Sequence, residues 1–244
     1  MKILAVSDKD DSKLQACVLK NMQFLQNIDL IVSCGDVSKQ YLEFLVDNLK
    51  KPLFFVEGNH QFLSPEKDIP GNYLDNKLFD FFSHDKYITS GGINIHSRIE
   101  NFNDFVFVGF EGSLRYNKGG FQYTQKEMSK IVDKIKSKIK LIRFFDCLFK
   151  RKRKDVIVVT HAPIKDIHDK QDLCHQGFTS FKKFVDEIKP VLWLHGHVHF
   201  EGQTNSQITK HDNTLVVNTY GFHIININDN DIKVVSNIQN LADY

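Results

Sequence analysis

The chain has 244 residues, of which 41% are hydrophobic, and a formal net charge of +2. This size suits one globular domain over residues 1–244, with two small domains as the alternative. The nearly balanced charge excludes a global field that would require a polyanionic partner.

Cysteine usage and the N-terminus indicate the compartment. The four cysteines are scattered and form no Cys-x-x-Cys pair, which is typical of reduced thiols rather than a disulfide framework. The chain begins MKILAVSD, which is too short and too polar for a signal peptide, and no apolar run is long enough to span a membrane. We therefore expect a cytoplasmic protein.

Short runs that are apolar at nearly every position predict strands buried on both faces of a sheet. They are KILAV (2–6), LIVSC (30–34), LFFV (53–56), FVFVGF (105–110), VIVVT (156–160), VLWLH (191–195) and LVVN (215–218). Residues 91–110 further predict antiparallel hairpin structure.

Helical spacing of apolar residues predicts helices at 12–27, 39–50 and 179–188. The alternation of strands and helices over residues 1–56 is typical of a βαβαβ unit. The sequence therefore predicts an α/β sandwich with mixed sheets.

Residues 125–154 differ from the rest of the chain, because they hold 12 Lys or Arg and 3 Asp or Glu. Apolar residues recur there every three or four positions, and Lys130, Lys134 and Lys138 form an adjacent stripe, so a basic amphipathic helix is predicted. One interpretation is a surface helix with solvated lysines. The other is a basic patch that contacts anionic lipid or nucleic acid.

Polar side chains follow five of the predicted strands. Sites in open α/β sheets lie beyond the carboxyl ends of the strands, so these side chains are expected to gather in one cluster. The cluster comprises Asp8, Asp36, Asn59, His161, His197 and His199.

The donors of this cluster are carboxylate, amide oxygen and imidazole, which suit Mn, Fe or Zn rather than a thiolate-rich structural zinc site. Each residue also has a structural interpretation, as a helix cap, a turn residue or a hydrogen-bonded histidine. The joint pattern is what favours a metal site.

In this order, the motifs resemble those of the calcineurin-like metallophosphoesterases. They are Asp8-Lys9-Asp10, Gly35-Asp36, Gly58-Asn59-His60-Gln61, Thr160-His161 and Gly196-His197-Val198-His199. The resemblance implies a four-layer α/β/β/α sandwich with two mixed β-sheets. It also implies a dinuclear metal centre and phosphoester hydrolysis by a metal-bridging hydroxide, either as a phosphodiesterase or as a phosphatase.

The resemblance also assigns the metal ligands. Asp36 would bridge two divalent ions, while Asn59, His161 and His197 would complete one site. Asp8, Asp10 and His199 would form the other. The family has histidine where this chain has Asp10, and an oxygen ligand there favours Mn²⁺ or Mg²⁺ over Zn²⁺ or Fe. We therefore expect two Mn²⁺ ions, with Mg²⁺, Fe and Zn²⁺ as alternatives.

The resemblance implies that His60 is the catalytic proton donor to the leaving oxygen. Gln61 replaces the acid that follows this motif in the family. Arg115 and His175 are candidate substrate-binding residues, with a surface loop residue and a structural hydrogen bond as the respective alternatives.

The expected partner is a small phosphoester or nucleotide-like substrate, with no obligate nucleic acid. A weak contact with an anionic surface through residues 125–154 is compatible with this activity. The alternative function is a non-catalytic metal-binding scaffold of the same fold that acts through protein or membrane contacts. The oligomeric state is left open.

Overall fold

Two mixed β-sheets form the centre of the molecule in this computed structural model, which describes residues 1–60, 88–89, 91–200, 207–228 and 231–236. Within these ranges, the first sheet has seven strands. Their order is β15 (Asp231–Ser236), β14 (Gly221–Asn228), β1 (Lys2–Ser7), β2 (Leu30–Ser33), β3 (Leu53–Phe55), β5 (Gly92–Asn94) and β4 (Ile88–Thr89). Strands β1, β2, β3 and β5 are parallel, and the others pair antiparallel.

The second sheet has six strands among the described residues. Their order is β12 (Ile208–His211), β13 (Thr214–Asn218), β11 (Leu192–His195), β10 (Asp155–Thr160), β7 (Phe105–Phe110) and β6 (Ile99–Phe102). The four central strands are parallel, and both edge strands are antiparallel. The short strands β8 (Ser113–Leu114) and β9 (Gln122–Tyr123) pair separately.

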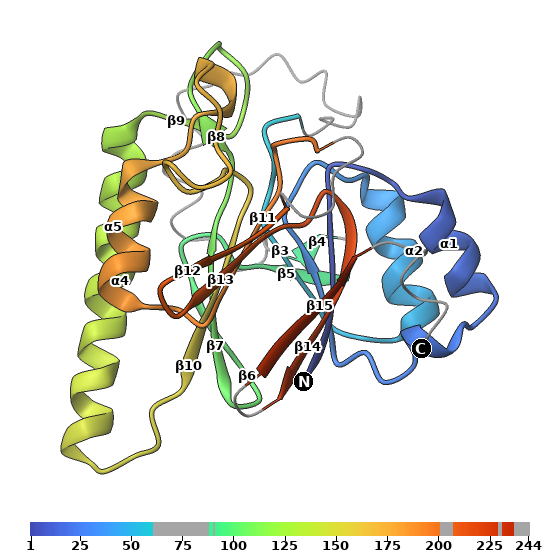
Figure 1. The fold of residues 1–244 in the computed structure, drawn as a ribbon, viewed down its shortest axis with the longest axis horizontal. Helices are drawn as coiled ribbons and strands as arrows, with labels where there is room; N and C mark the ends of the chain where they lie inside the picture. The colour runs from blue at the N-terminus through green and yellow to red at the C-terminus, as the bar shows by residue number, and fades with distance from the viewer. Residues whose placement is uncertain (61–87, 90, 201–206, 229–230, 237–244) are drawn as a thin grey trace.

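Helices cover the outer face of each sheet (Figure 1). The first sheet carries α1 (Ser12–Leu19) and α2 (Lys39–Leu49), and the second carries α4 (Gln125–Leu148) and α5 (Thr179–Ile188). Single turns of 3-10 helix lie at Gln23–Leu25 and Leu173–His175.

Side chains that point alternately to the two faces of each sheet explain the order of the layers. In β1, Leu4 and Val6 pack in the cluster that contains the buried residues of α1 and α2. Ile3 and Ala5 point the other way, into a cluster shared with Ile157 of the second sheet. Each strand therefore packs against helices on one face and a second sheet on the other, and the predicted four-layer sandwich is confirmed.

The sequence was less successful at some element boundaries. The helix predicted over 12–27 is wrong beyond Leu19, because Asn21 adopts a left-handed backbone conformation (φ 49°) and a 3-10 turn follows. Strands β6 and β7 form the expected hairpin, but β5 pairs with β3 in the other sheet. The helix within residues 125–154 ends at Leu148.

No helix in the described part of the chain is both long enough and apolar enough to cross a membrane.

Candidate metal centre

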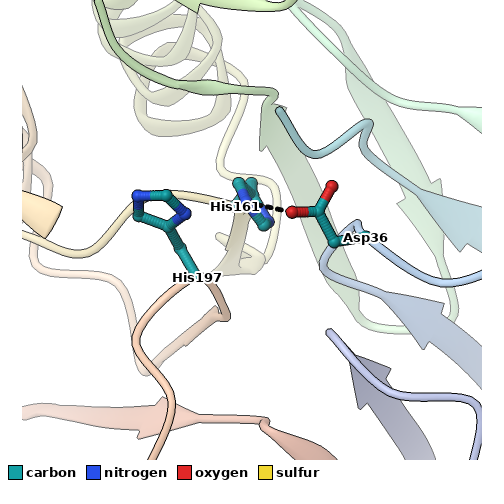
Figure 2. Close-up of side chains that lie close together, drawn as sticks. All are labelled: Asp36, His161 and His197. Carbon is teal, nitrogen blue, oxygen red and sulfur yellow. Dashed lines mark ion pairs between the residues drawn. The ribbon is translucent and has the colours of Figure 1, made fainter. Parts of the chain in front are cut away.

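Three ligand-bearing side chains meet where β2, β10 and β11 end. Asp36, His161 and His197 each place one potential ligand atom within 4.8 Å of the others (Figure 2). His161 and His197 are buried, and the Asp36 side chain is only 9% exposed. Two sheets thus contribute to a compact, largely water-excluded group of donors.

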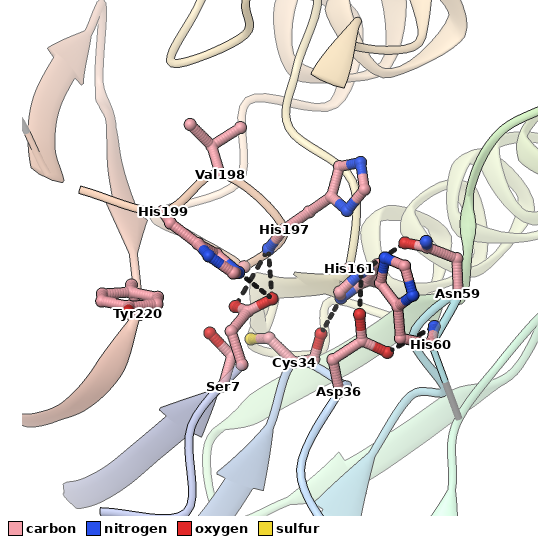
Figure 3. Close-up of polar contacts among 12 residues, drawn as sticks. Ser7, Cys34, Asp36, Asn59, His60, His161, His197, Val198, His199 and Tyr220 are labelled. Carbon is pink, nitrogen blue, oxygen red and sulfur yellow. Dashed lines mark hydrogen bonds and ion pairs between the residues drawn. The ribbon is translucent and has the colours of Figure 1, made fainter. Parts of the chain in front are cut away.

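The orientation of His161 is set by a backbone carbonyl. Its Nδ1 lies 2.8 Å from the carbonyl oxygen of Cys34, which can only accept, so Nδ1 carries the proton. Its Nε2 lies 2.9 Å from Asn59 Oδ1 and 3.2 Å from Asp36 Oδ2 (Figure 3). Metal-ligating histidines are commonly fixed by such a bond from the second ring nitrogen.

A hydrogen bond also fixes the orientation of the Asn59 side chain. Its amide Nδ2 donates to the Tyr116 hydroxyl at 3.0 Å, which leaves Oδ1 facing His161. The Nε2 lone pair of His161 and the oxygens of Asn59 and Asp36 therefore point at one another. Such convergence of acceptors requires either a proton or a cation between them.

The pKa shifts of His161 and Asp36 agree with a positive charge between these acceptors. Burial opposes charge on His161, but the Asp36 carboxylate outweighs it and raises the pKa of His161 above its ordinary value. Burial likewise acts against the Asp36 carboxylate, yet His161 lowers the pKa of Asp36. A positive charge at the position between them is thus stabilised.

His197 is held by a second backbone carbonyl. Its Nε2 donates to the carbonyl oxygen of Cys174 at 2.7 Å. Burial, together with the neighbouring His161, lowers the pKa of His197 to about 3. The ring is therefore neutral, and its Nδ1 lone pair is available as a ligand.

Asp8 and His199 lie next to this group. Asp8 follows β1, and its two carboxylate oxygens each lie 3.0 Å from the backbone nitrogen of His197. Its Oδ1 is 3.7 Å from Nε2 of His199, whose ring packs against Tyr220. The structure thus brings together the six residues that follow the strands.

Asp10 has a different partner. Its Oδ1 accepts a hydrogen bond from the backbone nitrogen of Ser38 at 3.0 Å, and the residue is exposed. This bond holds Asp10 beside the loop that carries Asp36 and leaves its second carboxylate oxygen for another contact. Its role as a metal ligand stays a prediction.

Glycines allow the backbone to approach the carboxylates. A Cβ on Gly58 would lie 1.9 Å from Asp36 Oδ1, and one on Gly196 would lie 2.4 Å from Asp8 Oδ2. Asp8, Asp36 and His197 themselves adopt left-handed backbone conformations, with φ between 53° and 68°. Backbone strain of this kind concentrates at functional sites.

The predicted proton donor, His60, borders the group. Its backbone nitrogen donates to Asp36 Oδ1 at 2.8 Å, and the residue is exposed to solvent. An exposed imidazole next to a buried candidate cation site can meet a substrate without being a ligand itself. Gln61, which follows His60 in the motif, lies outside the described residues.

The two predicted substrate-binding residues are placed differently. The His175 ring lies 5.2 Å from that of His197, and its Nδ1 is 2.7 Å from Asp172 Oδ1. The Arg115 guanidinium instead pairs with Glu127 at 2.9 Å, in the capping box of α4. His175 therefore borders the candidate ligand group, whereas Arg115 is bound to the start of a helix.

Sequence reasoning missed the groups that orient the ligands. They are Tyr116 and the carbonyl groups of Cys34 and Cys174. A carbonyl carries no side-chain signal in a sequence. Tyr116 directly follows Arg115, but nothing in the motif identifies its hydroxyl as the partner of Asn59.

The chain was compared with known proteins. A search of curated proteins found no match. Among solved structures, a crystal structure of TT1561 of Thermus thermophilus aligns with a TM-score of 0.57 and 14% identity, over 96% of this chain and 98% of that chain. The structure of a novel archaeal phosphodiesterase aligns with a TM-score of 0.43 and 13% identity, over 96% and 99% of the two chains.

The similarity to TT1561 supports the fold. The family is shown by a family model, described as calcineurin-like phosphoesterase, which matches residues 1–201. The resemblance inferred from the motifs is therefore confirmed, while the Asp-x-Asp variant of the first motif stays a prediction. This chain belongs to the calcineurin-like phosphoesterase family.

Proposed function

We propose that this chain is a metal-dependent phosphoester hydrolase with a dinuclear centre. Asp36, Asn59, His161 and His197 would hold one divalent cation, with Asp36 shared. Asp8, Asp10 and His199 would hold the second. The observation that carries the proposal is the buried convergence of Asp36, Asn59 and His161 at one point, where a divalent cation would take the place of the proton that His161 otherwise shares with Asp36.

The donor set fits hard or borderline divalent ions. It consists of carboxylate and amide oxygens and imidazole nitrogens, without thiolate, because the Cys34 thiol is buried and its pKa is raised to about 12. We propose Mn²⁺ as the resident ion, since Asp10 supplies oxygen rather than nitrogen. Bound divalent ions supply an acidified water and positive charge for phosphate oxygens.

The chain's own residues would complete the reaction. Hydrogen bonds to the carbonyls of Cys34 and Cys174 and to the Tyr116 hydroxyl hold the ligands in place without rearrangement. His60 would deliver a proton to the leaving oxygen of the substrate. His175, at the rim beside His197, would contact the phosphoester or its leaving group.

The test is hydrolysis of bis-p-nitrophenyl phosphate and p-nitrophenyl phosphate by metal-stripped protein, before and after Mn²⁺ addition. We expect turnover only with metal, and the ratio of the two rates distinguishes a diesterase from a monoesterase. His161→Asn should lose bound metal and turnover. The matched control His211→Asn, on β12 beside Asp186, should retain both.

Absence of turnover in folded protein with stoichiometric metal would contradict the enzyme proposal. It would favour a non-catalytic metal-binding scaffold instead. Circular dichroism of each variant separates loss of function from loss of fold.

A further inference from the structure

The C-terminal end of α4 exposes large apolar side chains that the proposed hydrolysis does not use. The helix buries Met128, Val132, Ile135 and Ile139 against the second sheet and α5. After Ile139 the exposed large apolar side chains are Leu141 (55%), Ile142 (42%), Phe144 (61%), Phe145 (43%), Leu148 (59%) and Phe149 (60%). We call these six residues the α4 tip.

The exposure of the α4 tip follows from the geometry of the helix. At about 100° per residue, Leu141 and Leu148 lie roughly 180–200° around the helix from Ile139, on the face that points away from the sheet. Arg143 donates to the carbonyl of Ile188, the last residue of α5, at 2.9 Å. Residues 144–148 therefore continue past the end of α5, as the lower end of α4 shows in Figure 1.

The aromatic rings of the α4 tip are ordered against one another. Phe145 and Phe149 stack with their centroids 6.2 Å apart, and Phe144 meets Phe145 edge-on at 5.7 Å. The Arg151 guanidinium lies over the Phe149 ring, 5.4 Å from its centroid. The rings of the α4 tip thus form a preformed apolar surface, with the Arg151 cation directly over one of them.

The charged residues around the α4 tip are mostly basic. Residues 140–155 hold seven Lys or Arg and two Asp, and five of the basic residues are consecutive at 150–154. Lys140 pairs with Glu187 and Arg143 bonds to Ile188, so the basic run 150–154 is the charge available beside the tip. Apolar side chains flanked by such a run are complementary to a bilayer that contains anionic phospholipid, where rings enter the acyl boundary and cations meet headgroups. A second copy of the same tip would repel it, and nucleic acid would leave the six apolar side chains exposed.

We propose that the α4 tip docks this protein on anionic phospholipid membranes. The docking end lies opposite the candidate metal centre. Residues 150–154 connect Phe149 of the tip to Asp155, where β10 begins; β10 ends at Thr160 and is followed by His161, which puts about 20 Å of strand between the start of β10 and His161. A docked molecule therefore keeps the metal centre directed away from the bilayer. Its phosphoester substrate would arrive from the aqueous side.

The experiment is co-sedimentation of the full chain with vesicles of phosphatidylcholine alone or with 30% phosphatidylglycerol. We expect at least tenfold tighter binding to the anionic vesicles, weakened by 0.5 M NaCl. Phe144→Ser/Phe149→Ser and Arg151→Glu/Arg153→Glu should each weaken binding at least tenfold. The controls Leu19→Ser, at a 70% exposed residue on α1, and Lys13→Glu/Lys20→Glu should change it less than twofold.

Insertion depth provides an independent readout. The chain's one tryptophan, Trp193, is fully buried, so a Trp introduced by Phe149→Trp is the one that acyl chains can reach. Its fluorescence should be quenched by brominated lipids in anionic vesicles. Turnover of a soluble phosphodiester by the tip variants should stay within twofold of the unmodified chain, which separates docking from catalysis.

Three results would overturn the proposal. The first is equal binding to neutral and anionic vesicles, or none to either. The second is unaltered vesicle binding by both tip variants. The third is an unmodified chain that does not bind vesicles but instead binds duplex DNA, or forms a dimer in light scattering, with that binding or dimer lost in the tip variants. DNA binding would assign the tip to a nucleic acid, and dimer formation would assign it to a second copy of the chain.

Discussion

At the scale of single residues, the candidate metal centre separates groups that would hold a cation from a group that would move a proton. His60 is exposed and touches Asp36 only through its backbone nitrogen. His60→Ala should therefore retain bound Mn²⁺ and lower kcat by about 10²- to 10⁴-fold, the usual contribution of a general acid. Metal content and kcat at saturating Mn²⁺ are the measurements, and parallel loss of metal would show that His60 is a ligand or structural.

In the proposed dinuclear centre, Asp10 would influence which metal the second site prefers. Asp10→His replaces an oxygen donor with a borderline nitrogen donor, so we expect the bound Zn²⁺ or Fe to rise relative to Mn²⁺. Metal analysis after equilibration with an equimolar mixture measures the change. Asp11→Asn is the matched control, because Asp11 caps α1 and the amide oxygen preserves that cap. An unchanged metal profile in Asp10→His would mean that Asp10 does not face the site.

Gly58 tests whether the position of Asp36 matters. Gly58→Ala would place a methyl carbon 1.9 Å from Asp36 Oδ1, so the carboxylate must move. We expect at least tenfold weaker Mn²⁺ binding by calorimetry. Gly120→Ala, where no atom lies within 4 Å of the new methyl, should bind as before. Normal binding by a folded Gly58→Ala protein would exclude Asp36 as a ligand.

The positions of the candidate ligands at the strand ends could be predicted from the sequence, while the orientation of their side chains could not. Asp8, Asp36 and His161 stand directly after apolar runs, and strand ends converge by the rules of parallel sheets. The directions of His161 and His197 depend on the carbonyls of Cys34, which follows β2, and of Cys174, which lies in the single 3-10 turn Leu173–His175. These carbonyls take their positions from the complete fold, so no local pattern encodes them.

At the scale of elements, α4 shows that the spacing of apolar residues predicts a helix but does not predict which of its residues are buried. Apolar residues recur at helical spacing along the whole of Gln125–Leu148, and the helix forms throughout. Burial nevertheless ends at Ile139, because α5 ends at Ile188 and offers nothing further to pack against. The sequence thus predicts the helix but not the exposure of its last turns, since exposure depends on the length of a neighbour.

This division within one helix can be measured. Ile135→Ala should lower the free energy of unfolding by about 2–5 kcal/mol, because it removes a buried side chain from the core of the second sheet. Leu148→Ala should change it by about 0.5 kcal/mol or less, since that side chain is 59% exposed. Urea unfolding of both variants provides the values. A comparable cost for Leu148→Ala would mean that the α4 tip is packed in solution, and would weaken the case for docking.

At the scale of the whole molecule, the candidate ligands connect the two sheets. Asp8, Asp36 and Asn59 follow strands of the first sheet, and His161, His197 and His199 follow strands of the second. The sheets otherwise meet through a shared apolar cluster. A cation held by both would therefore stabilise the folded chain as a unit, because the ligands separate when the sheets do.

Mn²⁺ should accordingly raise the thermal midpoint of metal-stripped protein. Binding to the folded state alone adds about 2.7 kcal/mol at 100 times Kd, and a chain of this size gains about 2–4 °C per kcal/mol, so the expected rise is about 5–10 °C. His161→Asn should show little of this rise. Phe144→Ser/Phe149→Ser should show all of it, because the α4 tip lies at the opposite end of β10 from His161. A full rise in His161→Asn would place the stabilising cation elsewhere, whereas a reduced rise in the tip variant would show that the two ends of the molecule are coupled.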